Sequence, residues 1–335
     1  MKFQVPELKF SKTFPKTTGL SPKSSILIYD QILSKSPNAN AWIQKFPFRY
    51  AVTSGEELKD LKNFPAHMEK ILNLSGEISE RPLQIVCLGG GSVGDFSGFS
   101  ASVLKRGVDF IQIPSTWLSA IDSAHGGKTA LNVGNIKNQI GSFHSANKIY
   151  LIRELLISQP QERMDEALGE ALKISLIQGK ALWKKWEKIQ VWNSENLWKL
   201  LPDLIKAKYQ IVKRDPWEQK GIRHVLNFGH TLGHVFEAEL GQAHGKAVLE
   251  GLRFAICWSE KKKILKSKSL LQSHFLPEIR NSLKSLQSPE KFLSQDKKRV
   301  ANGKIRFIFL QSPGKPLIQS VTVSEVLDEV KRQAQ

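Results

Sequence analysis

The first half of the chain alternates short apolar runs with amphipathic stretches. Residues 25–29 (SILIY), 83–88 (LQIVCL) and 110–113 (FIQI) are mainly apolar runs of strand length. Between them lie stretches with helical periodicity, of which residues 61–74 are an example. Buried strands that alternate with helices are typical of a mostly parallel sheet covered by helices. The pattern therefore predicts an α/β domain in this part of the chain.

After about residue 160 the pattern becomes helical, with amphipathic stretches at 163–180, 195–213, 230–240 and 247–265. Near the end, the runs 304–310 and 317–323 flank a Ser-Pro-Gly-Lys turn, which predicts a β-hairpin. Ser324 is the expected N-cap of a last helix. We therefore expect an α/β nucleotide-binding domain over residues 1–159 and a mainly helical domain over 160–335. We also expect a site in the cleft between them.

Charge and composition indicate which ligands and which cellular compartment to expect. The 335 residues carry 49 Lys and Arg against 31 Asp and Glu, a net charge of +18, which attracts anions of any kind. Trp183, Trp186 and Trp198 interleave with lysines, but their helical periodicity predicts packed core aromatics rather than base stacking on nucleic acid. No run approaches the about 20 apolar residues of a membrane span, and no apolar run follows the charged start. Cys87 and Cys257 lie in apolar segments, as free thiols do in the cytoplasm.

A glycine-rich segment, residues 88–95 (LGGGSVGD), directly follows one predicted strand and opens a predicted helix. Gly89, Gly91 and Gly94 satisfy the pattern G-x-G-x-x-G. Such glycines let the backbone approach a pyrophosphate, and the helix N-terminus presents free N–H groups to it. A tight turn without a ligand would look the same, so the motif alone is a weak indication of dinucleotide binding.

A second segment, residues 106–141, is rich in polar residues set among glycines, prolines and hydroxyl side chains. It carries Arg106, Asp122, Lys128, Lys137 and Asn138. Polar and basic residues in turns at a sheet edge form binding sites more often than cores. The alternative, a structural network of ion pairs, is the less favoured interpretation.

A third group has the composition of a metal site. Glu170 and Lys173 are three apart in a helical stretch, and His230 and His234 are four apart in another, so each pair shares a helix face. His244 follows in the next turn region. One carboxylate with two or three imidazoles suits a divalent cation, with zinc as the default. The spacing leaves open which of His230 and His234 binds the metal and which acts as a general acid or base.

Taken in order, these segments resemble the 3-dehydroquinate synthase family. The resemblance is carried by GGGSVGDFSGF, by RG, PST, DSxxGGKTA and KNxIGxF, by GEALK, and by GIRxxLNFGHTLGHxxE with the following HG. It covers the chain from about residue 25 to the end. It implies an α/β NAD-binding domain followed by a mainly α-helical metal-binding domain, in a cytoplasmic homodimer that requires NAD and zinc or cobalt.

The resemblance also implies a role for individual residues. Glu170, His230 and His244 correspond to the metal ligands and His234 to the acid/base beside them. The implied cofactor contacts are Asp30, Glu56, Lys59, Gly90, Gly91, Asp95, Ser115, Thr116 and Ser158. The implied substrate shell contains Lys128, Asn138, Lys173, Lys208, Arg223 and Asn227, with Asp122 and Lys137 assigned to both sets. Arg106, and one lysine of the pair 297–298, would reach the phosphate.

The implied reaction converts 3-deoxy-D-arabino-heptulosonate 7-phosphate to 3-dehydroquinate and phosphate, in the shikimate pathway. Two alternatives share the fold: a cyclase acting on sedoheptulose 7-phosphate, and a metal-dependent polyol dehydrogenase. Lys208, Arg223 and Asn227 together would bind the carboxylate of the heptulosonate, so their presence favours the 3-dehydroquinate synthase reaction. The sequence departs from the family pattern at Lys246, where His-Gly-Glu is usual, and at Gln219, where the family has an acidic residue. A cation two residues from a metal ligand should weaken metal binding unless its ammonium points away.

Overall fold

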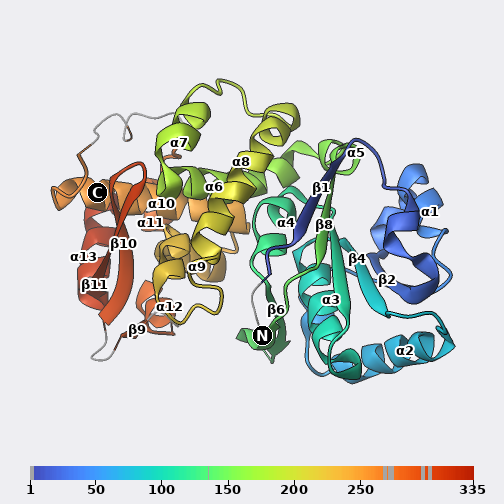
Figure 1. The fold of residues 1–335 in the computed structure, drawn as a ribbon. Helices are drawn as coiled ribbons and strands as arrows, with labels where there is room; N and C mark the ends of the chain where they lie inside the picture. The colour runs from blue at the N-terminus through green and yellow to red at the C-terminus, as the bar shows by residue number, and fades with distance from the viewer. Residues whose placement is uncertain (1–3, 135, 267–269, 271–274, 296–298, 301–303) are drawn as a thin grey trace. The chain divides into compact units, whose positions relative to one another are not determined.

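The computed structural model describes residues 4–335 except 135, 267–269, 271–274, 296–298 and 301–303. The chain forms two compact units, Met1–Arg163 and Met164–Gln335, and each has its own core. Figure 1 colours the first unit from blue to green and the second from green to red.

The first unit is built on a six-stranded parallel sheet in the order β1-β8-β5-β4-β2-β3 (Figure 1). The strands are β1 (Glu7–Ser11), β2 (Ser25–Asp30), β3 (Arg49–Val52), β4 (Gln84–Gly89), β5 (Asp109–Pro114) and β8 (Lys148–Ile152). The three apolar runs of the sequence are β2, β4 and β5, which occupy inner positions. The predicted α/β fold is therefore confirmed.

Helices cover both faces of this sheet, which explains why its inner strands are apolar throughout. They are α1 (Pro37–Ile43), α2 (Phe64–Glu77), α3 (Gly91–Val103), α4 (Trp117–Ile121) and α5 (Arg153–Ile157). Leu27, Val86 and Ile111 pack in one buried cluster with Trp42 and Phe46 of the α1 region. Successive strand residues point to opposite faces, so the intervening residues face the other layer, where α3 packs on β4 and β5.

The polar segment after β5 forms a separate antiparallel ribbon rather than turns alone. It consists of β6 (Lys128–Val133) and β7 (Ile136–Phe143), paired from Lys128 with Phe143 to Val133 with Ile136. Every residue from 136 to 141 on β7 is exposed, so no apolar alternation marks it as a strand. Single-turn helices complete the unit: η1 (Thr17–Leu20), η2 (Pro22–Ser24), η3 (Gln31–Lys35), η4 (Glu57–Lys59), η5 (Leu104–Arg106) and η6 (Ser123–His125).

The second unit is mainly helical, as predicted. Its helices are α6 (Gln161–Gln178), α7 (Lys180–Glu187), α8 (Ser194–Val212), η7 (Ile222–Asn227), α9 (His230–Leu240), α10 (His244–Lys261), α11 (Arg280–Lys284), α12 (Pro289–Gln295) and α13 (Val323–Ala334). The helix expected over 163–180 ends at Gln178, because Gly179 has φ +56° and starts a new helix. The helix expected from residue 247 begins three residues earlier, at His244.

A small antiparallel sheet, in the order β11-β10-β9, packs on α10. Its strands are β9 (Arg299–Val300), β10 (Lys304–Ser312) and β11 (Lys315–Thr322), and β10–β11 is the predicted hairpin. Trp258 of α10 lies with its ring centroid 4.7 Å from that of Phe307 and 5.2 Å from that of Phe309. Trp183 and Trp186 are buried core residues, as the periodicity indicates, whereas Trp198 is only half-buried.

The N-cap prediction for the last helix is wrong by two residues. Thr322 caps α13: its hydroxyl accepts a hydrogen bond from the Glu325 N–H, and the Glu325 carboxylate accepts one from the Thr322 N–H. Ser324 lies inside the first turn. Two N–H groups that the helix leaves unpaired are satisfied at once by this reciprocal pair, which a cap at Ser324 would not allow. Within the described part of the chain, no helix has the length and apolar character to cross a membrane.

Candidate active site

The glycine-rich segment lies at the carboxyl end of β4, where α3 begins. Gly90 caps α3, and a Cβ on Gly90 would lie 3.1 Å from Thr116 Cγ2. Thr116 in turn caps α4, where its hydroxyl accepts a hydrogen bond from the Ser119 N–H. The Ser115 N–H donates to the Gly89 carbonyl at 2.9 Å. The structure thus brings Gly90, Ser115 and Thr116 together at the carboxyl ends of neighbouring strands, where open α/β sheets bind ligands.

Lys59 joins two other predicted residues, and its side chain is only 5% exposed. Its ammonium lies 2.6 Å from Asp95 Oδ2 on α3 and 2.5 Å from Asn138 Oδ1 on β7. Burial raises the pKa of the Asp95 carboxyl, and the Lys59 cation acts against this shift. Asn138 has a left-handed backbone (φ +54°), and its N–H donates to Asn132 Oδ1. Lys59 therefore fastens the β6–β7 ribbon to the helix that follows the glycine-rich segment.

Glu56 lies beside this network. Its carboxylate accepts a hydrogen bond from Asn132 Nδ2 at 2.8 Å and lies 3.4 Å from Lys137 Nζ. Asn132 bridges two predicted residues, Glu56 and Asn138, yet sequence reasoning did not find it. Its partner Glu56 is 76 residues away in the chain, and one asparagine in a ribbon gives no local signal of such a contact.

A small polar cavity lies next to the start of α3. Its lining includes the predicted residues Gly91, Asp95 and Lys128. It also includes Gln112, Ser123 and His144, which the sequence did not indicate. The glycines make room for it: a Cβ on Gly94 would lie 2.4 Å from Gln112 Nε2. The remaining predicted residues of this unit have other positions. Asp30 caps η3, Arg106 ends η5, Asp122 follows α4, and the Ser158 hydroxyl bonds to Leu155 at the end of α5.

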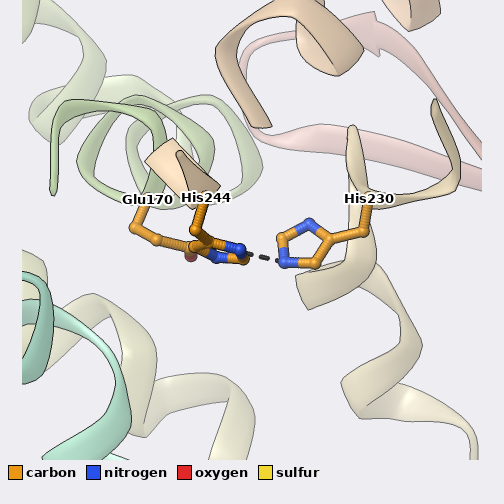
Figure 2. Close-up of side chains that lie close together, drawn as sticks. All are labelled: Glu170, His230 and His244. Atoms are coloured by element: carbon orange, nitrogen blue, oxygen red, sulfur yellow. Dashed lines mark hydrogen bonds and ion pairs between the residues drawn. The ribbon is translucent and has the colours of Figure 1, made fainter. Parts of the chain in front are cut away.

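In the second unit, Glu170, His230 and His244 converge from α6, α9 and α10 (Figure 2). One donor atom from each residue lies within 4.8 Å of the donor atoms of the other two, so the three residues could hold one cation. Glu170 Oε1 lies 3.3 Å from His230 Nε2 and 3.1 Å from His244 Nε2. Two donor atoms that each lie about 2.1 Å from a tetrahedral zinc ion are about 3.4 Å apart. These three residues therefore fit a divalent cation.

The outer nitrogens of both imidazoles have acceptors of their own. His230 Nδ1 lies 3.2 Å from the Phe228 carbonyl oxygen, and His244 Nδ1 forms a short hydrogen bond with Glu237 Oε1. An Nδ1–H that donates to an acceptor leaves the Nε2 lone pair directed at the cluster, which is how histidines bind metals. Glu237 is the last residue of the motif GIRxxLNFGHTLGHxxE, but no role was assigned to it from the sequence. The signal was available, since Glu237 lies seven residues after His230 and three after His234 on α9.

Two glycines let the helices carrying Glu170 and His244 approach closely. A Cβ on Gly169 would lie 2.4 Å from the Gly245 carbonyl oxygen, and one on Gly245 would lie 1.7 Å from the Glu166 carbonyl oxygen. Real Cβ atoms essentially never approach closer than 3.0 Å. The backbones of α6 and α10 can therefore touch only without side chains at these two positions. Each glycine is the immediate neighbour of a cluster residue.

The electrostatics of the cluster favour a cation. Burial raises the pKa of the Glu170 carboxyl, but the Lys173 ammonium and His230 together lower it well below its ordinary value. Lys173 forms a short ion pair with Glu170 Oε2, on the side away from the imidazoles. Burial would lower the pKa of His244, whereas its hydrogen bonds to Glu170 and Glu237 raise it to about 10. The two carboxylates, one at each nitrogen of the His244 ring, thus favour positive charge on this side of the cluster.

The other predicted residues of this unit lie on α8, η7 and α9. His234 is exposed, and its ring centroid lies 5.4 Å from that of His230. Lys208 is buried on α8, while Arg223 and Asn227 lie on η7. A buried carboxylate that was missed, Asp215, orders the loop before η7. It accepts hydrogen bonds from four backbone N–H groups, those of Gln219, Lys220, Ile222 and Arg223.

Both residues that depart from the family pattern lie in the described part of the chain. The Lys246 side chain is 65% exposed, and its ammonium lies 3.9 Å from Glu250 Oε1, one helical turn further along α10. Gln219 uses its backbone N–H to bond Asp215. The lysine pair 297–298 lies outside the described residues.

Two family models together match residues 49–301 of the chain. The model described as 3-dehydroquinate synthase N-terminal matches residues 49–166, and the one described as 3-dehydroquinate synthase C-terminal matches residues 167–301. The chain belongs to the 3-dehydroquinate synthase family. The 3-dehydroquinate synthase of Prochlorococcus marinus subsp. pastoris (strain CCMP1986 / NIES-2087 / MED4) is 38% identical over 264 residues, which cover 74% of this chain and 71% of that protein. That of Methylacidiphilum infernorum (isolate V4) is 32% identical, over 86% of this chain and 80% of that protein.

Solved structures of other enzymes share the fold of this 3-dehydroquinate synthase family member. A 2-deoxy-scyllo-inosose synthase, complexed with carbaglucose-6-phosphate, NAD+ and Co2+, has a TM-score of 0.80 at 22% identity and covers 97% of this chain and 96% of its own. A 2-epi-5-epi-valiolone synthase from Streptomyces hygroscopicus subsp. jinggangensis 5008, with NAD+ and Zn2+ bound, has a TM-score of 0.75 at 16% identity, covering 99% and 96%. An iron-containing alcohol dehydrogenase has a TM-score of 0.63 at 17% identity, covering 99% and 98%. At these identities the likeness concerns the fold alone.

Proposed function

We propose that the protein is a 3-dehydroquinate synthase, which converts 3-deoxy-D-arabino-heptulosonate 7-phosphate to 3-dehydroquinate and phosphate. Membership of the family over both units supports the activity. The observation that carries the proposal is the convergence of Glu170, His230 and His244 on one point. As a carbon–oxygen lyase acting on a phosphate, the enzyme would use NAD together with zinc or cobalt.

When bound, the cation would polarise substrate oxygens as a Lewis acid, and NAD would take up and return a hydride without net redox change. Glu170, His230 and His244 would hold the cation, and Lys173 keeps Glu170 charged. His234 is suited to move a proton at the substrate, because it is exposed and lies beside His230 on the same face of α9.

The substrate is an anion at both ends, with a carboxylate and a phosphate. Basic side chains that stay charged bind such groups through charge-assisted hydrogen bonds. We assign Lys128, Lys208, Arg223 and the amide of Asn227 to the substrate, and Arg106 to its phosphate. The net charge of +18 adds a long-range attraction for the same ligand.

We assign NAD binding to the first unit and binding of metal to the second. The glycine-rich start of α3, with Asp95, Ser115 and Thr116, would hold the pyrophosphate and neighbouring groups of the cofactor. The network of Glu56 and Lys59, with Asp30, Asp122, Lys137 and Ser158, completes the proposed cofactor set. A cytoplasmic homodimer is proposed from the family resemblance, and light scattering of the purified protein would measure the oligomeric state.

The test is an assay of the purified protein with NAD and zinc or cobalt. With 3-deoxy-D-arabino-heptulosonate 7-phosphate we expect release of phosphate, formation of 3-dehydroquinate and no accumulation of NADH. Glu170→Gln should abolish turnover, because it replaces the one carboxylate among the proposed ligands. Chelation of the metal should do the same, and added zinc should restore the wild type only.

Two other outcomes would reject the proposal in different ways. Release of phosphate from sedoheptulose 7-phosphate, with none from the heptulosonate, would identify a cyclase for the sugar phosphate that lacks a carboxylate. Steady accumulation of NADH with a polyol would identify a dehydrogenase. The two relatives described above, both named 3-dehydroquinate synthase at 38% and 32% identity, favour neither alternative.

A further inference from the structure

Glu237 forms a short hydrogen bond to His244 without being one of the proposed metal ligands. Its carboxylate contacts Nδ1 of the His244 imidazole, while Nε2 of the same ring faces Glu170 Oε1 at 3.1 Å. The imidazole is thus held at both nitrogens by carboxylates from two different helices, α9 and α6. We propose that Glu237 is a positioning residue that fixes His244 with its Nε2 lone pair directed at the metal. This inference rests on the metal-binding part of the proposed function.

His244 needs such support more than the other imidazole does. It is the first residue of α10, directly after a loop, and its side chain is 35% exposed, against 11% for His230. Packing therefore restrains its ring less, and a ring turned by half a rotation would place the carbon Cε1 where Nε2 should lie. A carboxylate on Nδ1 removes that freedom, because only the Nδ1–H tautomer satisfies it.

The position of Glu237 suits this role. It lies two turns after His230 on α9, so the helix that provides one ligand also orients another. Its side chain is 26% exposed, which keeps its hydrogen bond partly screened from water. The bond crosses the sharp turn between α9 and α10, where Gly241 has φ +64°. Glu237 therefore fixes the approach of α10 as well as the rotation of the ring.

The test measures zinc affinity of the full-length protein by competition with a chromogenic chelator. Glu237→Ala should weaken zinc binding by about 10- to 100-fold, the usual effect of removing the acceptor behind a metal-bound histidine. Glu237→Gln should stay within about threefold of the wild type, because the amide oxygen still accepts from Nδ1–H. Glu239→Ala is the matched control: it removes the same charge two residues away on the same helix, and zinc affinity should not change.

A double-mutant cycle separates positioning from a general loss of structure. Once His244→Ala has removed the ring, adding Glu237→Ala should weaken zinc binding no further. Equal losses in the Glu237→Ala and Glu237→Gln variants would overturn the inference, because charge rather than orientation would then be responsible. An unchanged affinity of Glu237→Ala would also overturn it. Failure of the wild type to bind zinc would instead reject the metal site, and with it the proposed function.

Discussion

Gly245→Ala should move two of the proposed metal ligands, Glu170 and His244, apart. The new Cβ would lie 1.7 Å from the Glu166 carbonyl oxygen and must retreat to at least 3.0 Å, a shift of about 1.3 Å. The obstacle is backbone on α6, so no side chain can rotate away. Glu170 lies on α6 and His244 is the residue before Gly245, so the same shift separates the two ligands. Their donor atoms would move from 3.1 Å apart to about 4.4 Å, beyond the about 3.4 Å that a zinc ion spans.

We expect zinc affinity to fall by at least about 100-fold, because metal ligands must be held to within about 0.5 Å. Overpacking should cost about 3 kcal/mol of unfolding free energy, of which the better helix propensity of alanine offsets about 1 kcal/mol. Chelator competition measures the first quantity and thermal unfolding the second. Gly76→Ala is the matched control, since a Cβ there meets nothing within 4 Å, and it should keep full zinc affinity. Wild-type zinc binding by Gly245→Ala would refute the close-approach argument.

Three further predictions concern single side chains. Asp215→Asn should lower the unfolding free energy by about 2–4 kcal/mol at neutral pH, because the amide NH2 that replaces one oxygen leaves two of the four backbone N–H groups without their acceptor. Burial raises the pKa of Asp215, but its backbone hydrogen bonds outweigh burial and lower it. This stabilisation is therefore present above about pH 4 and is lost as the pH falls through the lowered pKa. In denaturant titrations the difference in unfolding free energy between the variant and the wild type should shrink over that pH range, and a constant difference would contradict this. Lys246→Gln should change zinc affinity by no more than about threefold, because the ammonium is exposed and screened; a tenfold gain in a chelator titration would show that it acts on the metal. Thr322→Ala should destabilise the fold by about 1 kcal/mol in calorimetry and Ser324→Ala by less than about 0.5 kcal/mol; the reverse order would restore Ser324 as the cap.

The parts of the fold that sequence reasoning predicted are those with strong local patterns. β2, β4 and β5 were visible as apolar runs because helices bury both of their faces. α9 was predicted with both ends correct, and left-handed glycines, Gly229 and Gly241, flank it. The β6–β7 ribbon lacked any such pattern, since β7 is almost wholly exposed. α10 was placed three residues late, because His244-Gly245-Lys246 does not resemble the start of a helix.

In the candidate site, too, the residues that could be predicted are those with a local sequence pattern. The histidines of α9 and the carboxylate of α6 could be assigned to helix faces from spacing alone, but only family resemblance distinguished His230 from His234 as a ligand. The structure supports that choice geometrically, since His230 Nε2 lies 3.3 Å from Glu170 while His234 is exposed. Asn132 and Asp215 stayed hidden, because each has partners that depend on how the chain folds back. Hydrogen bonds of that kind leave no periodic trace in a sequence.

The buried pair of Glu170 and Lys173 is better explained by binding than by stability. Their side chains are 1% and 3% exposed, and the cost of removing two charges from water largely cancels their attraction. An apolar pair of similar volume would stabilise the two adjacent turns of α6 at least as well. Burial raises the pKa of Glu170, however, and Lys173 is the largest of the influences that lower it. Only the ionised carboxylate is a good ligand for a divalent cation. Because Lys173 contacts Oε2, it keeps Glu170 charged and leaves Oε1 facing the two imidazoles, where a cation would be shared.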